Sequence, residues 1–361
     1  MSSVTYEGAP IKAESTNSPV RTWLIILCGI IVLLIVFGGF VRLSHSGLSM
    51  VEWNIVTGIL PPMSDSQWQE AFEKYQKSPE YLLVNTGFSL PEYRTIYLIE
   101  YTHRLIARSA GLVVLIPLAI FLLRGTIPIR RSGPYITIAG LFVAQGLFGW
   151  YMVKSGLIDE PQVSPFRLTV HLLIALALLG LCMRQVFQIS RQALTVKQRP
   201  AMHPSIDQRS ARLSLALLGL IVVQIAYGGL VAGFKAGNVS DTFPLMFGTL
   251  IPSELLSLEG SWWMNLVANE VTVHFVHRWF AFVIFFGAMF AYSQFRKSDS
   301  PESLTQLSLL ALILIGLQIV LGILVILYHV PLSVALIHQT VGVLIFASVC
   351  ALNYRLFYRT A

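Results

Sequence analysis

The amino-acid sequence predicts an all-α, polytopic membrane protein of eight transmembrane helices, built as two four-helix-bundle repeats of parallel topology. Three observations support this prediction. Hydrophobic residues make up 55% of the chain and charged residues only 12%, whereas soluble domains carry about 25% charged residues. Several apolar runs approach the ~20 residues that cross a bilayer. Histidine-containing motifs also recur, in the same order, in the two halves of the chain.

Seven spans are apolar almost throughout. Six of them are long apolar runs, at residues 23–41, 135–153, 213–232, 279–292, 307–328 and 334–353. A further span runs from about Arg167 to Val186 and includes His171. The mean hydropathy of +0.68 agrees with so many apolar segments in one chain.

The eighth span contains the apolar run 109–123, which is too short to cross a bilayer alone. Its helix must therefore begin near Tyr97. The ionisable residues that this start draws into the span are Glu100, His103, Arg104 and Arg108. The run 279–292 must likewise be extended back to about Val271, which takes in further histidines.

The positions of Lys and Arg predict the orientation, because cytoplasmic loops carry an excess of these residues. Most of the 25 Lys and Arg residues fall in five segments, at 1–22, 124–133, 184–213, 293–304 and 354–361. Both termini are therefore expected to be cytoplasmic. The first twenty residues resemble neither a signal peptide nor a transit peptide, so a bacterial inner membrane is expected. The net charge of +7 then reflects membrane topology, and no nucleic-acid partner is expected.

Three pairs of motifs reveal the internal repeat. "EYTHRLIA" matches "HFVHRWFA", "QGLFGWYMV" matches "QIVLGILVI", and "RLTVHLLIAL" matches "VALIHQTVGV". The corresponding spans have the same direction, so the repeats are parallel rather than inverted. The predicted organisation is an N-terminal tail, a first half, a basic cytoplasmic linker, a second half and a C-terminal tail, at residues 1–22, 23–187, 188–212, 213–354 and 355–361. The long outer segment 43–95 is expected to form a small structured cap.

Four histidines occupy one structural position. His103, His171, His277 and His338 each lie near the outward end of an even-numbered span. Two facing imidazoles in each bundle suit a planar metal macrocycle held by axial ligands. A single metal ion would need three or four ligands close together. The alternative is that each is a hydrogen-bonded packing residue, but four ionisable groups at matched depth favour ligation.

The two halves differ beside these histidines. Glu100 lies one turn before His103, whereas His274 holds the matching position in the second half. Glu100 is either an acid–base or positioning group beside the macrocycle, or the ion-pair partner of Arg104. Arg104 and Arg278 are candidates for contacts to propionate groups of such a macrocycle, with snorkelling to the headgroups as the alternative. This inequality suggests that one site performs chemistry while the other carries electrons or supports the structure.

The chain resembles the haem A synthase family from about residue 23 to residue 355. The stretches that carry the resemblance are "GGFVRLSHSGLSMVEWNIVTGILPP", "EYTHR", "QGLFGWYMVKSGL" with "FRLTVHL", "GGLVAGFKAGNVSDTFPLM", "HFVHR" and "VALIHQ". The long first outer loop is similar to the mitochondrial and proteobacterial branch. Another branch has a cysteine pair in that loop, which this chain lacks.

The resemblance implies a specific chemistry. The family oxidises one ring methyl of haem O to a formyl group by successive hydroxylations, which gives haem A for terminal oxidase assembly. The second half resembles the half that binds a permanent haem b, with His277 and His338 as ligands. The first half resembles the substrate site, with His103 and His171 flanking haem O. The family's important glutamate matches Glu100, which favours a catalytic role for that residue.

The implied partners follow from this chemistry. Haem O is the substrate, and haem O synthase and an unidentified electron donor are expected partners. Membrane lipid would surround the farnesyl tail of haem O, and the sequence is compatible with a homo-oligomer. The main alternative is a di-haem cytochrome b electron-transfer subunit, which predicts two permanent b haems and equivalent halves. A transporter built on parallel repeats is a weaker alternative, because the histidines lie near one membrane face.

Overall fold

The computed structural model describes residues 18–52, 57–158, 160–192, 208–259, 261–297 and 300–360. Most of the predicted N-terminal tail and the centre of the predicted linker therefore lie outside the described residues. The domain boundaries inferred from the sequence stay predictions.

Eight long helices confirm the predicted spans. They are α1 (Pro19–Leu43), α4 (Leu90–Leu123), α5 (Gly133–Lys154), α6 (Pro165–Gln192), α7 (Gln208–Phe234), α9 (Glu270–Lys297), α10 (Glu302–Leu327) and α11 (Leu332–Thr360). All eight are long and apolar enough to cross a membrane. The described residues contain no β-strand, so the predicted all-α class is confirmed.

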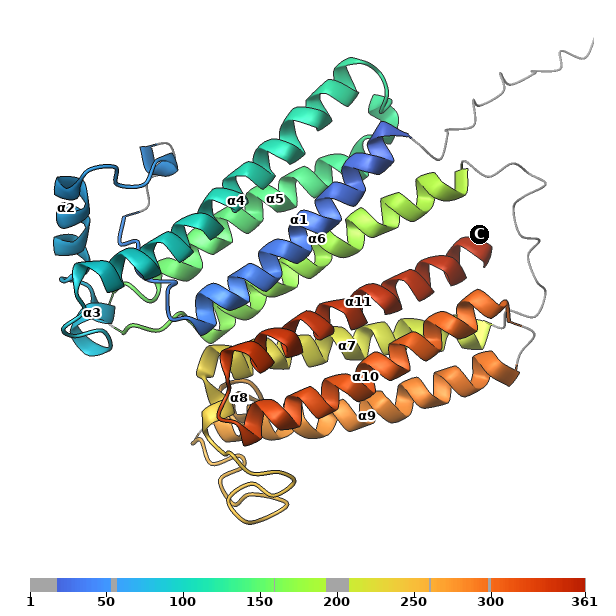
Figure 1. Ribbon diagram of the computed structural model, residues 1–361. Helices are drawn as coiled ribbons and strands as arrows, with labels where there is room; N and C mark the ends of the chain where they lie inside the picture. Colours follow the sequence, from blue (N-terminus) through green and yellow to red (C-terminus); the bar gives the residue numbers. More distant parts are fainter. Residues whose placement is uncertain are drawn as a thin grey trace, which may run out of the picture.

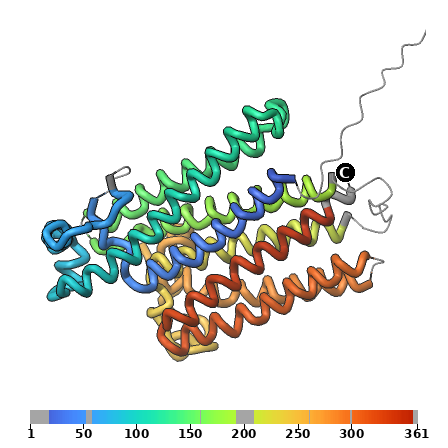
Figure 2. The backbone as a smooth tube through the Cα atoms, turned by 45° about the horizontal axis from the view of Figure 1, so that its top comes forward, coloured from blue at the N-terminus to red at the C-terminus, as the bar shows by residue number. Residues whose placement is uncertain are grey.

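The helices form two four-helix bundles that lie side by side (Figures 1 and 2). One bundle contains α1, α4, α5 and α6, and the other contains α7, α9, α10 and α11. The inner helices α1, α6, α7 and α11 make the interface between the bundles. The start of α1 and the end of α11 lie at the same end of the molecule, as an even number of spans requires (Figure 1).

The interface between the bundles depends on close backbone approach. Membrane helices gain little from burying apolar surface against one another, so they pack best where small residues let the backbones come close. At Gly233 of α7, a Cβ atom would collide with Pro165 at the start of α6, at 2.7 Å from its Cβ. The two bundles therefore meet most tightly at their outer ends.

Helix α4 begins at Leu90, earlier than the expected start near Tyr97. Pro91 lies in its first turn, and the Glu92 carboxylate accepts a hydrogen bond from the Ser89 backbone N–H at 2.7 Å. Both features favour a helix start at this point. The extra turns project beyond the apolar run and contact the outer loop.

The outer segment between α1 and α4 forms the predicted cap. It contains η1 (Thr57–Ile59), α2 (Asp65–Tyr75) and α3 (Pro79–Leu83). Tyr75 of α2 stacks on Tyr93 of α4 with ring centroids 4.8 Å apart, and Phe72 and Ile96 complete a small apolar cluster. The corresponding loop of the second half contains η3 (Ala236–Asn238) and α8 (Trp262–Ala268), and η2 (Ile129–Arg131) joins α4 to α5.

The close approach at Gly233 yields a test of the interface. Replacing Gly233 by Ala should lower stability by roughly 1–3 kcal/mol, because the added methyl must push α6 and α7 apart. The melting temperature of the detergent-solubilised protein, followed by intrinsic fluorescence, should fall by several degrees. Gly219→Ala on the same helix is the control, since its Cβ would meet nothing within 4 Å. Equal melting temperatures for both variants would contradict this view of the interface.

Candidate functional site

The second bundle places two histidines face to face. His277 of α9 and His338 of α11 have ring centroids 6.5 Å apart, with an interplanar angle of 75°. Two metal–nitrogen bonds of about 2 Å, plus roughly 1 Å from each nitrogen to its ring centre, give about 6 Å between axial imidazoles. The observed spacing therefore fits a metal macrocycle held between these two rings.

The first bundle repeats this arrangement with His103 of α4 and His171 of α6. Each ring is half-buried, and the two are close enough to interact electrostatically. Phe37 of α1 lies beside His103, with ring centroids 6.0 Å apart. The structure thus brings the four predicted histidines together as two pairs. Among the described residues, no three His, Cys, Asp or Glu side chains are placed to hold a single metal ion.

Each imidazole lies against a glycine of the preceding long helix. A Cβ built on the glycine would lie only 3.1–3.2 Å from a ring atom, at Gly38 against His103, Gly149 against His171, Gly228 against His277 and Gly322 against His338. A larger residue would push each ring out of place. We call this glycine–imidazole contact a cradle. It occurs four times, so the two halves are built to hold the same kind of group.

Glu100 is buried inside a hydrogen-bonded network at the outer end of the first bundle. Only 3% of the residue is exposed. Its carboxylate accepts hydrogen bonds from the Ser49 hydroxyl at 2.7 Å and from the Met50 backbone N–H at 2.9 Å, and it pairs with Arg104 at 2.5 Å. Glu100 thus forms the expected ion pair with Arg104 and also holds the outer loop in place. Its role as an acid–base or positioning group beside the macrocycle stays a prediction.

The two buried arginines have matching roles. Arg104 donates to the backbone carbonyl oxygens of Met50 and Glu52 at 3.3 and 3.4 Å. Arg278 donates to those of Ser240 and Thr242, both at 2.9 Å. Each guanidinium therefore fixes the outer loop of its own half. Contacts of these arginines to haem propionates stay predictions.

The second half has a histidine where the first has its carboxylate. His274 is 2% exposed, and its Nε2 accepts a hydrogen bond from Arg278 Nε at 2.9 Å. The arginine thus pairs with an imidazole in one half and with a carboxyl group in the other. The chemical inequality predicted from the sequence therefore extends to the contacts of the two sites.

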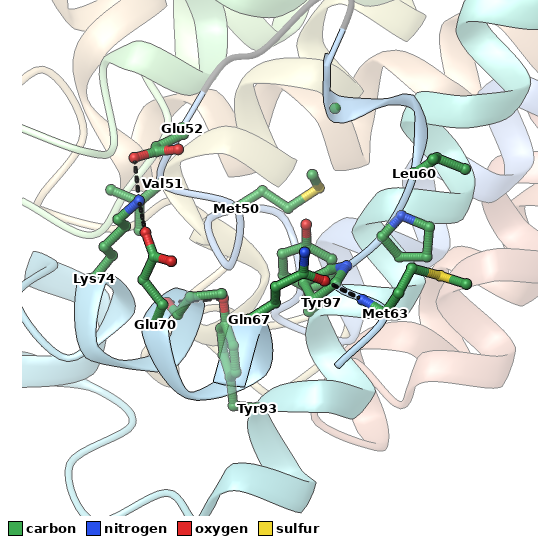
Figure 3. Close-up of a pocket in the computed structure, with 14 residues that line it drawn as sticks. Met50, Val51, Glu52, Leu60, Met63, Gln67, Glu70, Lys74, Tyr93 and Tyr97 are labelled. Carbon is green, nitrogen blue, oxygen red and sulfur yellow. Dashed lines mark hydrogen bonds and ion pairs between the residues drawn. The ribbon is translucent and has the colours of Figure 1, made fainter. Parts of the chain in front are cut away.

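A cavity of about 390 Å³ lies beneath the cap, between α2 and α4 (Figure 3). Met50, Tyr93 and Tyr97 line it, together with Lys74, which pairs with Glu52 at 2.8 Å and with Glu70 at 2.9 Å. Met50 also donates its backbone N–H to Glu100. The cavity is therefore separated from the Glu100 network by a single loop segment.

The sequence interpretation missed three glutamines on the helices that face the histidines. Gln145, Gln224 and Gln318 each contact a histidine or its backbone. Each lies four residues before one of the cradle glycines. That Gln-x-x-x-Gly spacing was the signal that could have identified them.

The cap contains a second buried carboxyl, that of Glu80. It is 5% exposed and accepts a hydrogen bond from the Tyr75 hydroxyl at 3.2 Å. Burial, strengthened by the charge of Glu100, raises the pKa of Glu80 to about 7, while Tyr75 and Lys235 partly offset this shift. A carboxyl whose pKa is raised on folding favours the folded state below its unfolded pKa of 4.5, and that stabilisation is lost as pH rises through 7.

The cap should therefore loosen between pH 5 and pH 8. By 1.36 kcal/mol per pKa unit, the change in local stability is at most about 3 kcal/mol. Hydrogen exchange of cap peptides, corrected for intrinsic rates, should show less protection at the higher pH. Glu80→Gln should abolish this pH dependence, whereas Glu73→Gln, at an exposed position of α2, should retain it. A pH dependence that survives Glu80→Gln would contradict the assignment.

Comparison with known proteins gives consistent matches over most of the chain. A family model described as cytochrome oxidase assembly protein matches residues 21–350. A protein of Rhodopseudomonas palustris (strain BisB5) named heme A synthase is 41% identical over 332 residues, covering 91% of this chain and 88% of the relative. A protein of Wolbachia sp. subsp. Brugia malayi (strain TRS) with the same name is 39% identical over 343 residues, covering 94% and 98%.

Proposed function

The chain belongs to the family of cytochrome oxidase assembly proteins that includes the heme A synthases, and on that premise we propose how its four histidines and Glu100 divide the work. The protein is a haem-binding oxidoreductase that converts haem O to haem A, by oxidising a ring methyl to a formyl group. It is a multi-pass membrane protein with eight spans.

The second bundle is the proposed site of a permanent haem b. His277 and His338 would be its axial ligands, and their 6.5 Å centroid separation supports this assignment. Haem b, when bound, would supply one-electron redox chemistry. The glycines at 228 and 322 keep both rings in place against their neighbouring helices.

The first bundle is the proposed site of the substrate, with His103 and His171 on either side of haem O. The observation that carries this proposal is the buried carboxylate of Glu100, one turn from His103, where the second half has His274. Each hydroxylation of the methyl by molecular oxygen takes up two electrons from the donor and two protons, and it releases one water. Two such steps and the loss of one further water give the formyl group, so the substrate site needs a group that transfers protons. Glu100, held by Ser49 and Arg104, is the proposed proton-transfer group.

Several further assignments complete the proposal. The distribution of Lys and Arg supports an orientation with both termini in the cytoplasm, and the bacterial inner membrane is the proposed location. Haem O synthase and an electron donor of unidentified chemistry are the proposed partners, and membrane lipid would accommodate the farnesyl tail. Arg104 and Arg278 keep their proposed contacts to haem propionates, and a homo-oligomer is compatible with this arrangement.

The di-haem cytochrome b alternative is less favoured. That function needs two equivalent electron-carrying sites, whereas Glu100 and His274 make the two sites chemically unequal. The matches to proteins named heme A synthase also favour the synthase function.

Haem analysis of variants of the four proposed ligands tests whether the second half binds haem b and the first half binds haem O. The purified protein made without a haem O supply should contain haem B alone, and with that supply also haem A and hydroxylated haem O. His277→Ala and His338→Ala should lose haem B, whereas His103→Ala and His171→Ala should keep it and form no haem A. Chromatography with mass analysis of the extracted haems gives each result. Two equivalents of haem B in the unsubstituted protein under both conditions would favour the electron-transfer alternative.

Replacement of Glu100 tests its role in proton transfer. Glu100→Gln should keep haem b but lower the rate of haem A formation by roughly 10²–10⁴-fold, the usual range for loss of a general acid or base. The control is Glu73→Gln, which removes an exposed carboxyl of the cap. Unchanged turnover in Glu100→Gln would remove the catalytic role and leave Glu100 as a partner of Arg104.

A further inference from the structure

Three of the four histidines face a helix with the same pair of residues. A glutamine lies four positions before the cradle glycine in Gln145 with Gly149, Gln224 with Gly228, and Gln318 with Gly322. Residues four apart share one face of a helix. Each glutamine therefore lies one turn from the place where the imidazole meets the helix.

The three amides contact the histidines that they face. Gln145 Nε2 lies 3.3 Å from His171 Nε2 and donates to the His171 carbonyl oxygen at 3.1 Å. Gln318 Nε2 lies 3.2 Å from His338 Nε2. Gln224 Nε2 donates to the His277 carbonyl oxygen at 2.9 Å. Each amide thus ties the histidine's helix to its neighbour at the level of the ring.

Each of these glutamine–histidine pairs also contains two buried polar atoms that have no hydrogen-bond partner. Within the described residues, the Oε1 atoms of Gln145, Gln224 and Gln318 are buried without a hydrogen-bond partner. So are the Nδ1 atoms of the three histidines that they face, His171, His277 and His338. A histidine that binds a metal normally donates its other ring N–H to an acceptor, which fixes the ring and its tautomer. Each glutamine thus brings a spare amide acceptor to the histidine that it contacts.

The fourth histidine lacks this partner. On α1, Leu34 holds the position four residues before Gly38. The ring of His103 interacts with the backbone of Leu34, and the rings of His277 and His338 interact in the same way with the backbones of Gln224 and Gln318. His103 thus has the backbone contact without the side-chain amide. The helix pair α1 and α4 therefore has no amide tie at the level of its histidine.

We propose that Gln145, Gln224 and Gln318 are positioning residues that hold three axial histidines in place, and that His103 is the least firmly held of the four ligands. This inference rests on the two haem sites of the proposed function. It places the weaker ligand in the substrate site, beside Glu100. An iron with two firmly held imidazoles has no free position, so a site that performs oxidation benefits from one ligand that gives way.

Installing the missing amide is the most direct test. Leu34→Gln should tie α1 to α4 and strengthen the hold on His103. Carbon monoxide is the probe, because it binds reduced haem only where an axial ligand yields. One interhelical hydrogen bond in a membrane changes an equilibrium by about 3- to 20-fold. The affinity of the haem O-loaded, reduced protein for carbon monoxide, measured from its absorption spectrum, should fall by that factor.

Leu33→Gln is the matched control. It adds the same amide to the same helix, but Leu33 is exposed on the outside of the bundle. Its carbon monoxide affinity should equal that of the unsubstituted protein. A similar decrease in both variants, or none in Leu34→Gln, would overturn the assignment of His103 as the weaker ligand.

The opposite change in the second half is an independent test. Gln318→Met removes the amide at similar side-chain length, and should raise the fraction of haem b that binds carbon monoxide by about 3- to 20-fold. The midpoint potential of haem b should also shift, while haem content stays the same. If haem b is bound but both readings are unchanged, the glutamines are not positioning residues. Absence of haem b from the unsubstituted protein would instead contradict the proposed function, and with it this inference.

Discussion

The apolar interior of a membrane offers no water to polar side chains, so each buried polar group needs a partner within the protein. Arg104 meets this need by pairing with Glu100 and donating to the carbonyl oxygens of Met50 and Glu52. Arg278 does so through Ser240 and Thr242. Because these carbonyls belong to the outer loops, the partners of the buried arginines also determine where the loops lie over the histidines.

The two bundles share one scaffold, and their chemistry lies in the few places where they differ. The scaffold is the repeated contact between a histidine and a glycine, which sets the distance between paired helices at the level of the ring. Two substitutions distinguish the halves at this level. Glu100 corresponds to His274, and Leu34 corresponds to Gln224. The first difference gives the first half a buried carboxylate, and the second leaves its His103 without an amide partner, in keeping with the proposed substrate site.

The cap extends the first half beyond the outer ends of its spans, through α2 and α3. Its aromatic cluster anchors α2 on the outer turns of α4. The carboxyl of Glu80 lies near enough to Glu100 for their charges to interact. The cap thus shields Glu100 from solvent. The adjoining cavity lies next to the loop segment whose Met50 binds Glu100.

The sequence alone determined the eight spans, the repeat and the two pairs of histidines, because apolar length and motif spacing are local properties of the chain. It also singled out Glu100, since an acid within a span is unusual. The tertiary structure decided which groups meet across helices. Besides Glu100 and His274, the partners of Arg104 and Arg278 are backbone carbonyls, whose positions residue type does not reveal. The contacts of Gln145, Gln224 and Gln318 depend on how neighbouring helices are rotated, and only packing fixes that rotation.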